Sequence, residues 1–388
     1  MAVGMCSLAS PSLAADWFAK TSFSQTVEAN DNFFLSTNPK GNTYASTSAV
    51  FVETAARFPT SQYIFNGDFA YIRYLGPGAA DASLTRLTQN GVSLNAEYAG
   101  HRPGDKLNFT ASWRQQDIAT AQLNDIGVVT AQGELSTITF GSSVNKQLSA
   151  VDSLSFNVLG SSVTGTQPFR TLNTGSTWTR ALSPIADGYA LGDFSWTMRE
   201  DATNSETKFT RVLTGLRLRP STRLRIYTSG GVGIVSGTSA TATPGIFGAP
   251  VAGSGTVQPG NGGAVVDWLA DILMAYKLLN STEMTVSAGR AITPGVLGDL
   301  SLRTSYSLGV NHTVNATSSV NVNAGLTKTG GSGTTSDFWT AGASYERRLT
   351  REWRTNLSYN YRKRISDSPT VTSNSVVFVL ARDVTLLQ

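Results

Sequence analysis

Arginine is concentrated around one short polar stretch of this chain, Pro220–Thr222. On each flank the arginines are spaced by an even number of residues and alternate with apolar residues such as Leu216 and Leu224. Successive side chains of a β-strand point to opposite faces, so this spacing puts every guanidinium of a flank on one face. A hairpin would align both flanks into a cationic ladder. Its members are Arg211, Arg217 and Arg219 before the turn, and Arg223 and Arg225 after it.

A cationic ladder that faces water inside a pore favours the passage of anions. A second interpretation stays open, in which neighbouring carboxylates pair with the arginines and make the wall rigid. The carboxylates concerned are Asp193, Asp267 and Asp271, and Arg303 belongs to the same predicted set of pore-lining charges.

The chain contains few residues that could act in catalysis or bind a metal ion. The chain has only 2 histidines, His101 and His312, each beside a predicted short turn, and a Ser/His hydrolase needs its base within hydrogen-bond reach of the nucleophile. No His/Cys cluster suits a transition metal, and Gly230–Gly233 lies in a strand pattern instead of a phosphate-binding loop. The sequence therefore predicts no enzyme, no metal site and no cofactor.

The elements that would position the arginines are amphipathic β-strands. Leu107, Phe109, Ala111 and Trp113 alternate with polar residues after the turn Arg102–Asp105, and this pattern recurs along the chain. Strict alternation over about ten residues is typical of a transmembrane β-barrel. Only 14% of residues are charged, and no apolar run approaches the roughly 18 residues of a spanning helix. The formal charge of +4 is spread along the chain, which argues against a nucleic-acid partner.

Eight short turns set the predicted topology. These turns pair sixteen strands, and one further strand near Thr21–Asn30 precedes them and another near Asn374–Asp383 follows them. The prediction is therefore an antiparallel up-and-down barrel of about eighteen strands, with sixteen strands as the alternative. Both termini then lie at the periplasmic side. The turns are Pro59–Gln62, Arg102–Asp105, Ser149–Ser153, Ser183–Asp187, Pro220–Thr222, Asn280–Thr282, Asn315–Ser318 and Thr350–Glu352.

Parity assigns each side chain to the lipid face or to the lumen. A charge on the lipid face costs about 2–4 kcal/mol at the bilayer midplane, so charged rows are predicted to face inward. Outward rows include Tyr63, Phe65 and Phe69; Val92, Leu94 and Tyr98; Val266, Trp268 and Ile272; and Leu302, Tyr306 and Leu308. Aromatic residues near strand ends are predicted to form interfacial girdles, with core aromatics of a β-sandwich as the alternative: Trp17, Trp113, Trp178, Trp339, Trp353 and Tyr361.

Two segments lie outside the strand pattern. Met1–Ala15 has no charge and ends in small residues, which predicts a signal peptide. A basic start is missing, so a truncated signal peptide and an apolar tail are the alternatives. The remaining chain, 16–388, is predicted to form one barrel domain. Because the single cysteine, Cys6, lies in the first segment, this domain has no disulfide. The longest connection, Gly237–Gly263, has no charge and is predicted to be a solvated outer loop, with an inward-folded constriction as the alternative.

Three short patches resemble a family of outer-membrane β-barrel porins often encoded near exopolysaccharide genes in proteobacteria. They are Ser22–Ser36 with its Asn-Asp-Asn turn, Gly67–Tyr74 and Thr174–Arg180. The resemblance implies an outer-membrane barrel for sugars or polysaccharide. The chain departs from such barrels at its end, because its last strand finishes at Gln388 without an aromatic residue.

The sequence thus predicts a porin-like channel for small hydrophilic solutes or saccharides in the outer membrane of a Gram-negative bacterium. The alternative is a structural barrel that anchors or accompanies a multiprotein or polysaccharide-export assembly, and a third hypothesis is a soluble or secreted β-sandwich or solenoid adhesin. The expected partners are outer-membrane lipid and lipopolysaccharide, with a homo-oligomer or an envelope protein as further candidates.

Overall fold

Eighteen β-strands follow one another along the chain. The computed structural model describes 16–387 apart from 83–85, 100–103, 119–120, 122–132, 166–167, 201–204, 239–263, 295–299, 332–333 and 367–368. The strands are β1 Asp16–Asn30, β2 Thr43–Arg57, β3 Ser61–Leu75, β4 Arg86–Ala99, β5 Lys106–Asp117, β6 Glu134–Gln147, β7 Asp152–Gly165, β8 Phe169–Ser183, β9 Ala186–Arg199, β10 Glu206–Leu218, β11 Leu224–Thr238, β12 Val265–Leu279, β13 Thr282–Pro294, β14 Leu300–Asn315, β15 Ser318–Gly331, β16 Thr334–Arg348, β17 Trp353–Ser366 and β18 Val371–Leu387. A short 3₁₀ helix, η1 Pro77–Ala82, follows β3.

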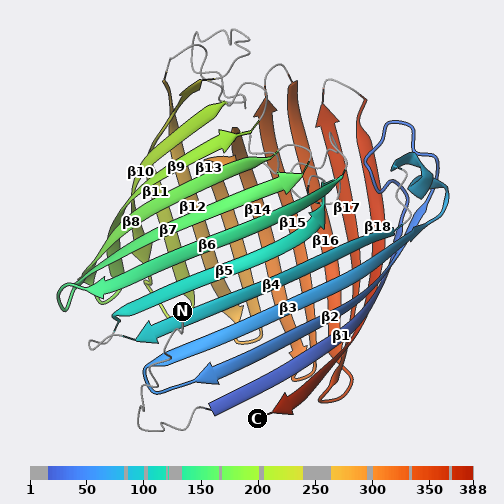
Figure 1. Cartoon of the computed structure of the whole chain (residues 1–388), viewed down its shortest axis with the longest axis horizontal. Helices are drawn as coiled ribbons and strands as arrows, with labels where there is room; N and C mark the ends of the chain where they lie inside the picture. The colour runs from blue at the N-terminus through green and yellow to red at the C-terminus, as the bar shows by residue number, and fades with distance from the viewer. Residues whose placement is uncertain are drawn as a thin grey trace, which may run out of the picture.

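Every strand pairs antiparallel with its neighbours in sequence, and β1 pairs with β18, so the sheet closes into a barrel (Figure 1). This confirms the predicted eighteen-stranded up-and-down barrel. The predicted short turns join β2 to β3, β4 to β5 and so on to β16 and β17, and in the turn between β4 and β5 only Gly104 and Asp105 are described. We call their end of the barrel the short-turn end and the other the long-loop end. The first and last strands are longer than predicted, Asp16–Asn30 and Val371–Leu387.

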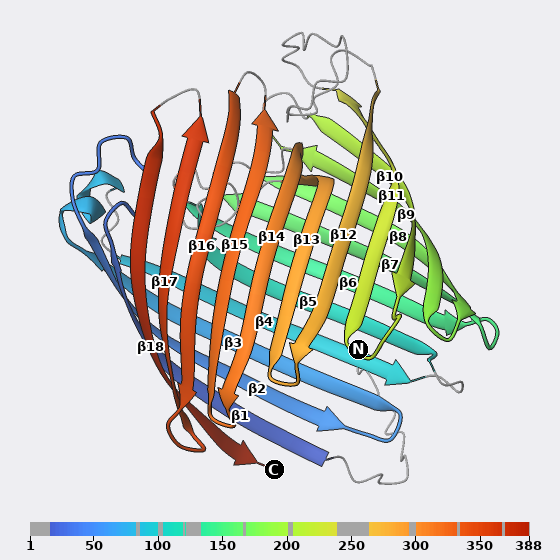
Figure 2. The same cartoon turned by 180° about the vertical axis from the view of Figure 1, so that it is seen from behind.

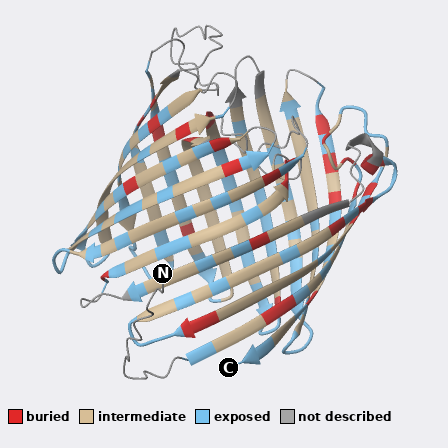
Figure 3. Cartoon of the chain, viewed as in Figure 1, coloured by how far each residue is buried: buried red, intermediate tan, exposed pale blue. Residues whose placement is uncertain are grey.

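Exposed and partly buried residues alternate along most strands (Figure 3). Directly opposite residues of paired strands lie on the same face of the sheet, so the register shows which residues of successive strands share the outer or the inner face. The outer face holds large exposed apolar side chains, such as Tyr63, Phe65 and Phe69 on β3 and Tyr306 and Leu308 on β14. Charged side chains such as Asp68, Asp193 and Arg211 lie on the inner face.

Glycines on the inner face near mid-strand allow polar neighbours to lie flat along the wall. Asp193 and Asn157 both cover Gly175, and a Cβ at Gly289 would come within 2.8 Å of an Asp271 carboxylate oxygen. Gly91 has Asp68 above it in the same way. A substituent on these glycines would push the polar groups away from the wall and toward the centre of the barrel.

The closing seam between β1 and β18 is fastened by the Asn-Asp-Asn turn. The Asp31 carboxylate accepts hydrogen bonds from the Asn374 backbone N–H at 2.7 Å and from its side-chain amide at 2.6 Å. Ser373 donates to the Asn30 side chain at 2.9 Å, and the Asn32 amide donates to the Thr372 carbonyl at 3.1 Å. The motif therefore has a structural role in closing the barrel.

The upper part of the β13–β14 hairpin departs from the wall and folds inward. Pairing between β12 and β13 ends at Ala270 and Arg290, although both strands continue toward the long-loop end. Figure 2 shows the side of the barrel that contains β12, β13 and β14. Leu302, which parity places in a lipid-facing row, is only 3% exposed and packs on the inner side. The alternation is correct along β14, but the bend turns its outer face onto the inner face of the neighbouring wall.

The inner face at the long-loop end also holds two smaller apolar clusters. Ile72 and Tyr74 pack with Ala79 of η1, and Ile118 packs with Leu135, Val163 and Phe169. Within the described residues, no helix is long and apolar enough to cross a membrane. The same part of the chain contains no group of three or more His, Cys, Asp or Glu that could hold a metal ion.

Candidate functional site: the inner wall of the barrel

The predicted arginine ladder lies on β10 and β11 and their connecting turn, and most of its members have partners. Arg211 donates to Asp193 at 2.6 Å, and Arg219 pairs with Asp187. Arg225 pairs with Glu283 of β13 at 3.3 Å. The carboxylates therefore neutralise three of the five arginines, in the manner of the second interpretation.

Two arginines of the ladder are not paired with a carboxylate. The Arg217 guanidinium lies 5.0 Å from the ring centroid of Tyr189, a cation–π contact that leaves its charge in place. The Arg223 guanidinium makes no ion pair or hydrogen bond with any residue that the structure describes. Both lie at the short-turn end, so the uncompensated charge of the ladder is concentrated at one mouth of the barrel.

The other charges of the predicted set have different surroundings. Asp271 faces the inside above Gly289 and has no ion pair within the described chain. Arg303 of β14 donates to the Ser301 hydroxyl at 3.1 Å and has further contacts. Asp267 of β12 does not reach the ladder and pairs instead with Arg290 of β13, a residue that the sequence prediction does not include.

Arg290 occupies the open seam between β12 and β13. It donates to both carboxylate oxygens of Asp267, at 2.9 and 3.0 Å, and its guanidinium lies 4.5 Å from the Trp268 ring. The Asp267 carboxylate also accepts the Trp268 backbone N–H at 2.8 Å, on a stretch of β12 that has no pairing with β13. The Arg290 and Asp267 side chains are only 13% and 20% exposed. Their ion pair thus joins the inward-folded hairpin to the wall.

Apolar packing holds the hairpin in the same position. Ile292, Leu300 and Leu302 pack against Phe209, Val235 and Leu269 from the inner faces of β10, β11 and β12. A Cβ at Gly233 of β11 would lie 3.3 Å from Ile292 Cδ1, although β12 separates β11 from β13. The hairpin therefore lies inside the barrel and narrows it near the long-loop end. The connection Gly237–Gly263, which is predicted to be a solvated outer loop, falls almost wholly outside the described residues.

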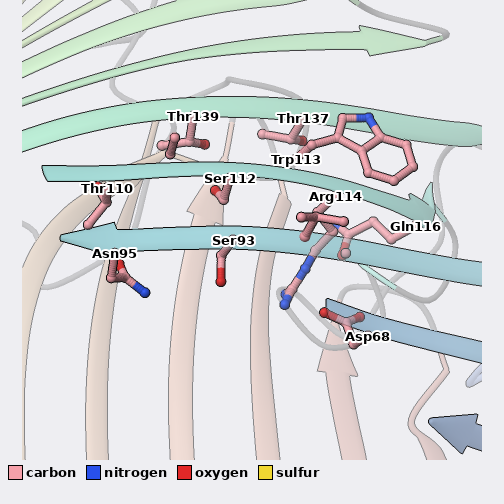
Figure 4. Close-up of a pocket in the computed structure, with 13 residues that line it drawn as sticks. Asp68, Ser93, Asn95, Thr110, Ser112, Trp113, Arg114, Gln116, Thr137 and Thr139 are labelled. Carbon is pink, nitrogen blue, oxygen red and sulfur yellow. The ribbon is translucent and has the colours of Figure 1, made fainter. Parts of the chain in front are cut away.

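The wall of β3–β6 is open and polar. A hollow of about 500 Å³ lies along it, bordered by hydroxyl and amide side chains of β4 to β6 and by the charged residues Asp68 and Arg114 (Figure 4). The polar side chains labelled there are Ser93, Asn95, Thr110, Ser112, Gln116, Thr137 and Thr139. The predicted set of pore-lining charges includes neither Asp68 nor Arg114. The available signal for Arg114 was its even position beside Ser112 and Thr110.

The predicted girdle residues lie on the outer face near both ends of the barrel. Trp17, Trp178 and Trp353 are near the short-turn end, and Trp113, Trp339 and Tyr361 are toward the long-loop end. Trp17 and Trp339 are exposed, and Trp113 donates to the Ser136 hydroxyl at 2.8 Å. His312 contacts Thr282 at 2.8 Å, whereas His101 is outside the described residues.

Comparison with known proteins supports the barrel architecture. No family model and no curated protein matches the chain. Among solved structures, Pseudomonas aeruginosa OccK2 (OpdF) in complex with glucuronate is 9% identical, with a TM-score of 0.53 over 96% of this chain and 99% of that one. A BenF-like porin from Pseudomonas fluorescens Pf-5 is 9% identical, with a TM-score of 0.54 over 95% and 99%. P. aeruginosa OpdK with vanillate is 8% identical, with a TM-score of 0.52 over 95% and 99%. At these identities the likeness concerns the fold.

Proposed function

We propose that this protein is an outer-membrane channel for passive diffusion of small hydrophilic solutes. The observation that carries the proposal is a closed eighteen-stranded barrel with exposed apolar side chains outside and charged side chains inside. Barrels of this size enclose an aqueous or partly plugged interior. The apolar outer face fits contact with outer-membrane lipid and lipopolysaccharide, with the short turns and both termini at the periplasmic side. The likeness in fold to OccK2, OpdK and the BenF-like porin supports the same function.

We further propose a moderate preference for anions. Arg217 and Arg223 are the unneutralised charges of the ladder, and both lie at the short-turn mouth. Solutes that bear a carboxylate would be attracted to such a mouth. The glucuronate and vanillate of the OccK2 and OpdK complexes both contain a carboxylate. Sugar acids fit the proposal better than neutral saccharides.

Planar-bilayer recording of the purified barrel tests both statements. We expect stepwise conductance and a reversal potential in a KCl gradient that shows preference for chloride. A folded barrel, checked by heat-modifiable migration in a detergent gel, that stays silent would overturn the channel and favour the structural barrel of an envelope assembly. Conductance with a cation preference would overturn the anion preference alone.

A further inference from the structure

Two charges on the wall of β3–β5 face the inside without an ion-pair partner among the described residues. The Asp68 carboxylate of β3 and the Arg114 guanidinium of β5 have no hydrogen bond or ion pair with any other described residue. On the same wall, Glu97 and Lys106 are joined at 2.7 Å, so unpaired charge is a local property of Asp68 and Arg114. β4 is six strands from β10 around the ring, so these charges are separate from the arginine ladder.

The register places the two residues on opposite sides of β4. Asp68 and Arg114 are both directly opposite Gly91, one on each side of β4. Because β3 and β5 are two strands apart, the Cα atoms of Asp68 and Arg114 are separated by about 10 Å. Because Gly91 has no side chain, the Asp68 carboxylate lies over it, and Arg114 reaches over β4 from the other side (Figure 4). A negative and a positive group therefore border one hollow.

We propose that Asp68 and Arg114 form a binding site for small zwitterions, that is, solutes with one carboxylate and one ammonium group. The Arg114 guanidinium binds the carboxylate and the Asp68 carboxylate binds the ammonium. Each contact is a charge-assisted hydrogen bond, and a solute with both groups makes the two contacts at once. The proposal rests on the proposed channel function and names one class of its solutes.

The rest of the hollow suits a hydrophilic solute of this size. Its volume of about 500 Å³ is within the range of small-molecule sites. Ser93, Asn95, Thr110 and Thr139 border it with hydroxyl and amide groups. The Trp113 indole, which also borders this stretch, donates to Ser136 on the outer face and provides no stacking surface inside. Recognition therefore depends on charge and hydrogen bonds.

Three solutes of the same chain length test the proposal in planar bilayers and proteoliposomes. The probes are γ-aminobutyrate, butyrate and butylammonium, and the readouts are half-blocking concentration and permeation rate. We expect γ-aminobutyrate to block at a concentration about tenfold lower than either singly charged analogue. Asp68→Asn and Arg114→Gln should each abolish this difference. Glu97→Gln, which alters a paired carboxylate of the same wall, should leave it unchanged.

A charge swap, Asp68→Arg with Arg114→Asp, keeps both charges in the hollow and should restore the zwitterion preference. Heat-modifiable migration checks the folding of each variant. Equal blocking by all three probes in a conducting channel, or an equal loss of all three interactions in Asp68→Asn, would overturn the zwitterion site and leave the channel intact. A silent wild-type barrel would instead overturn the proposed function.

Discussion

The wall of β9–β14 and the wall of β3–β6 both place charged side chains on the inner face, but they surround them differently. On β9–β14 most charges are paired, and the inward-folded hairpin covers the upper wall with apolar side chains. On β3–β6, Asp68 and Arg114 have no ion pair with any residue in the described part of the chain, and they border an open hollow. Charge alone therefore does not assign a role to a lumen residue. A charged side chain that is close to an opposite charge stabilises the wall, whereas one that is far from an opposite charge is able to bind a solute.

The largest effect is expected from breaking the ion pair of the hairpin. Arg290→Ala leaves the mostly buried Asp267 without its partner, and removing one member of a buried pair costs about 3–5 kcal/mol. We expect a correspondingly lower free energy of unfolding in urea titrations and noisier single-channel current. Arg225→Ala, which breaks an exposed pair, should cost about 0–1 kcal/mol. Equal losses in the two variants would contradict the difference in burial.

A smaller loss is expected from the apolar contacts of the same hairpin. Leu302→Ala removes a side chain that is 3% exposed and should lower the free energy of unfolding by about 2–3 kcal/mol. Channel conductance should rise, because the hairpin is held less firmly inside. Leu308→Ala is the matched control on the same strand, since Leu308 is 45% exposed on the outer face. A Leu302→Ala barrel with unchanged stability and conductance would rule out the inward packing.

On the open wall, Gly91→Val should disturb the hollow with less effect on stability. A side chain at Gly91 meets the Asp68 carboxylate and displaces it, at a cost of about 1–2 kcal/mol. Conductance should fall and the zwitterion preference should weaken. Gly67→Val on the neighbouring strand is the control, because nothing lies within 4 Å of a Cβ there. Indistinguishable currents from the two variants would show that Gly91 keeps no space open.

The smallest effect concerns ion selectivity at the short-turn mouth. Arg223→Gln removes an unpaired charge and should lower the chloride-to-potassium permeability ratio by less than about twofold, since exposed charges are strongly screened. The double variant Arg225→Gln with Glu283→Gln removes a neutral pair and should leave the ratio unchanged. Reversal potentials at low salt measure both. A larger shift in the double variant would mean that pairing does not decide selectivity.

The fold follows closely from the sequence, whereas the pairing within the site does not. The apolar residues Leu107, Phe109, Ala111 and Trp113 alternate with polar ones, and this period of two identifies a β-strand. Pro220–Thr222 identifies the tight turn between two strands. Both signals are local. The choice of Arg290, instead of a ladder arginine, as the partner of Asp267 is not local, because it depends on where β13 leaves β12.

The sequence by itself determined the number of strands, the order of the turns and the parity of nearly every side chain, because each of these depends on neighbours in the chain. Tertiary structure alone decided which charges are neutralised. It also turned Leu302 from a predicted lipid-facing residue into a buried one, and it brought Asp68 and Arg114 to either side of Gly91. The physical reason is that charge pairing and burial depend on the register and bending of strands that closure of the barrel brings together.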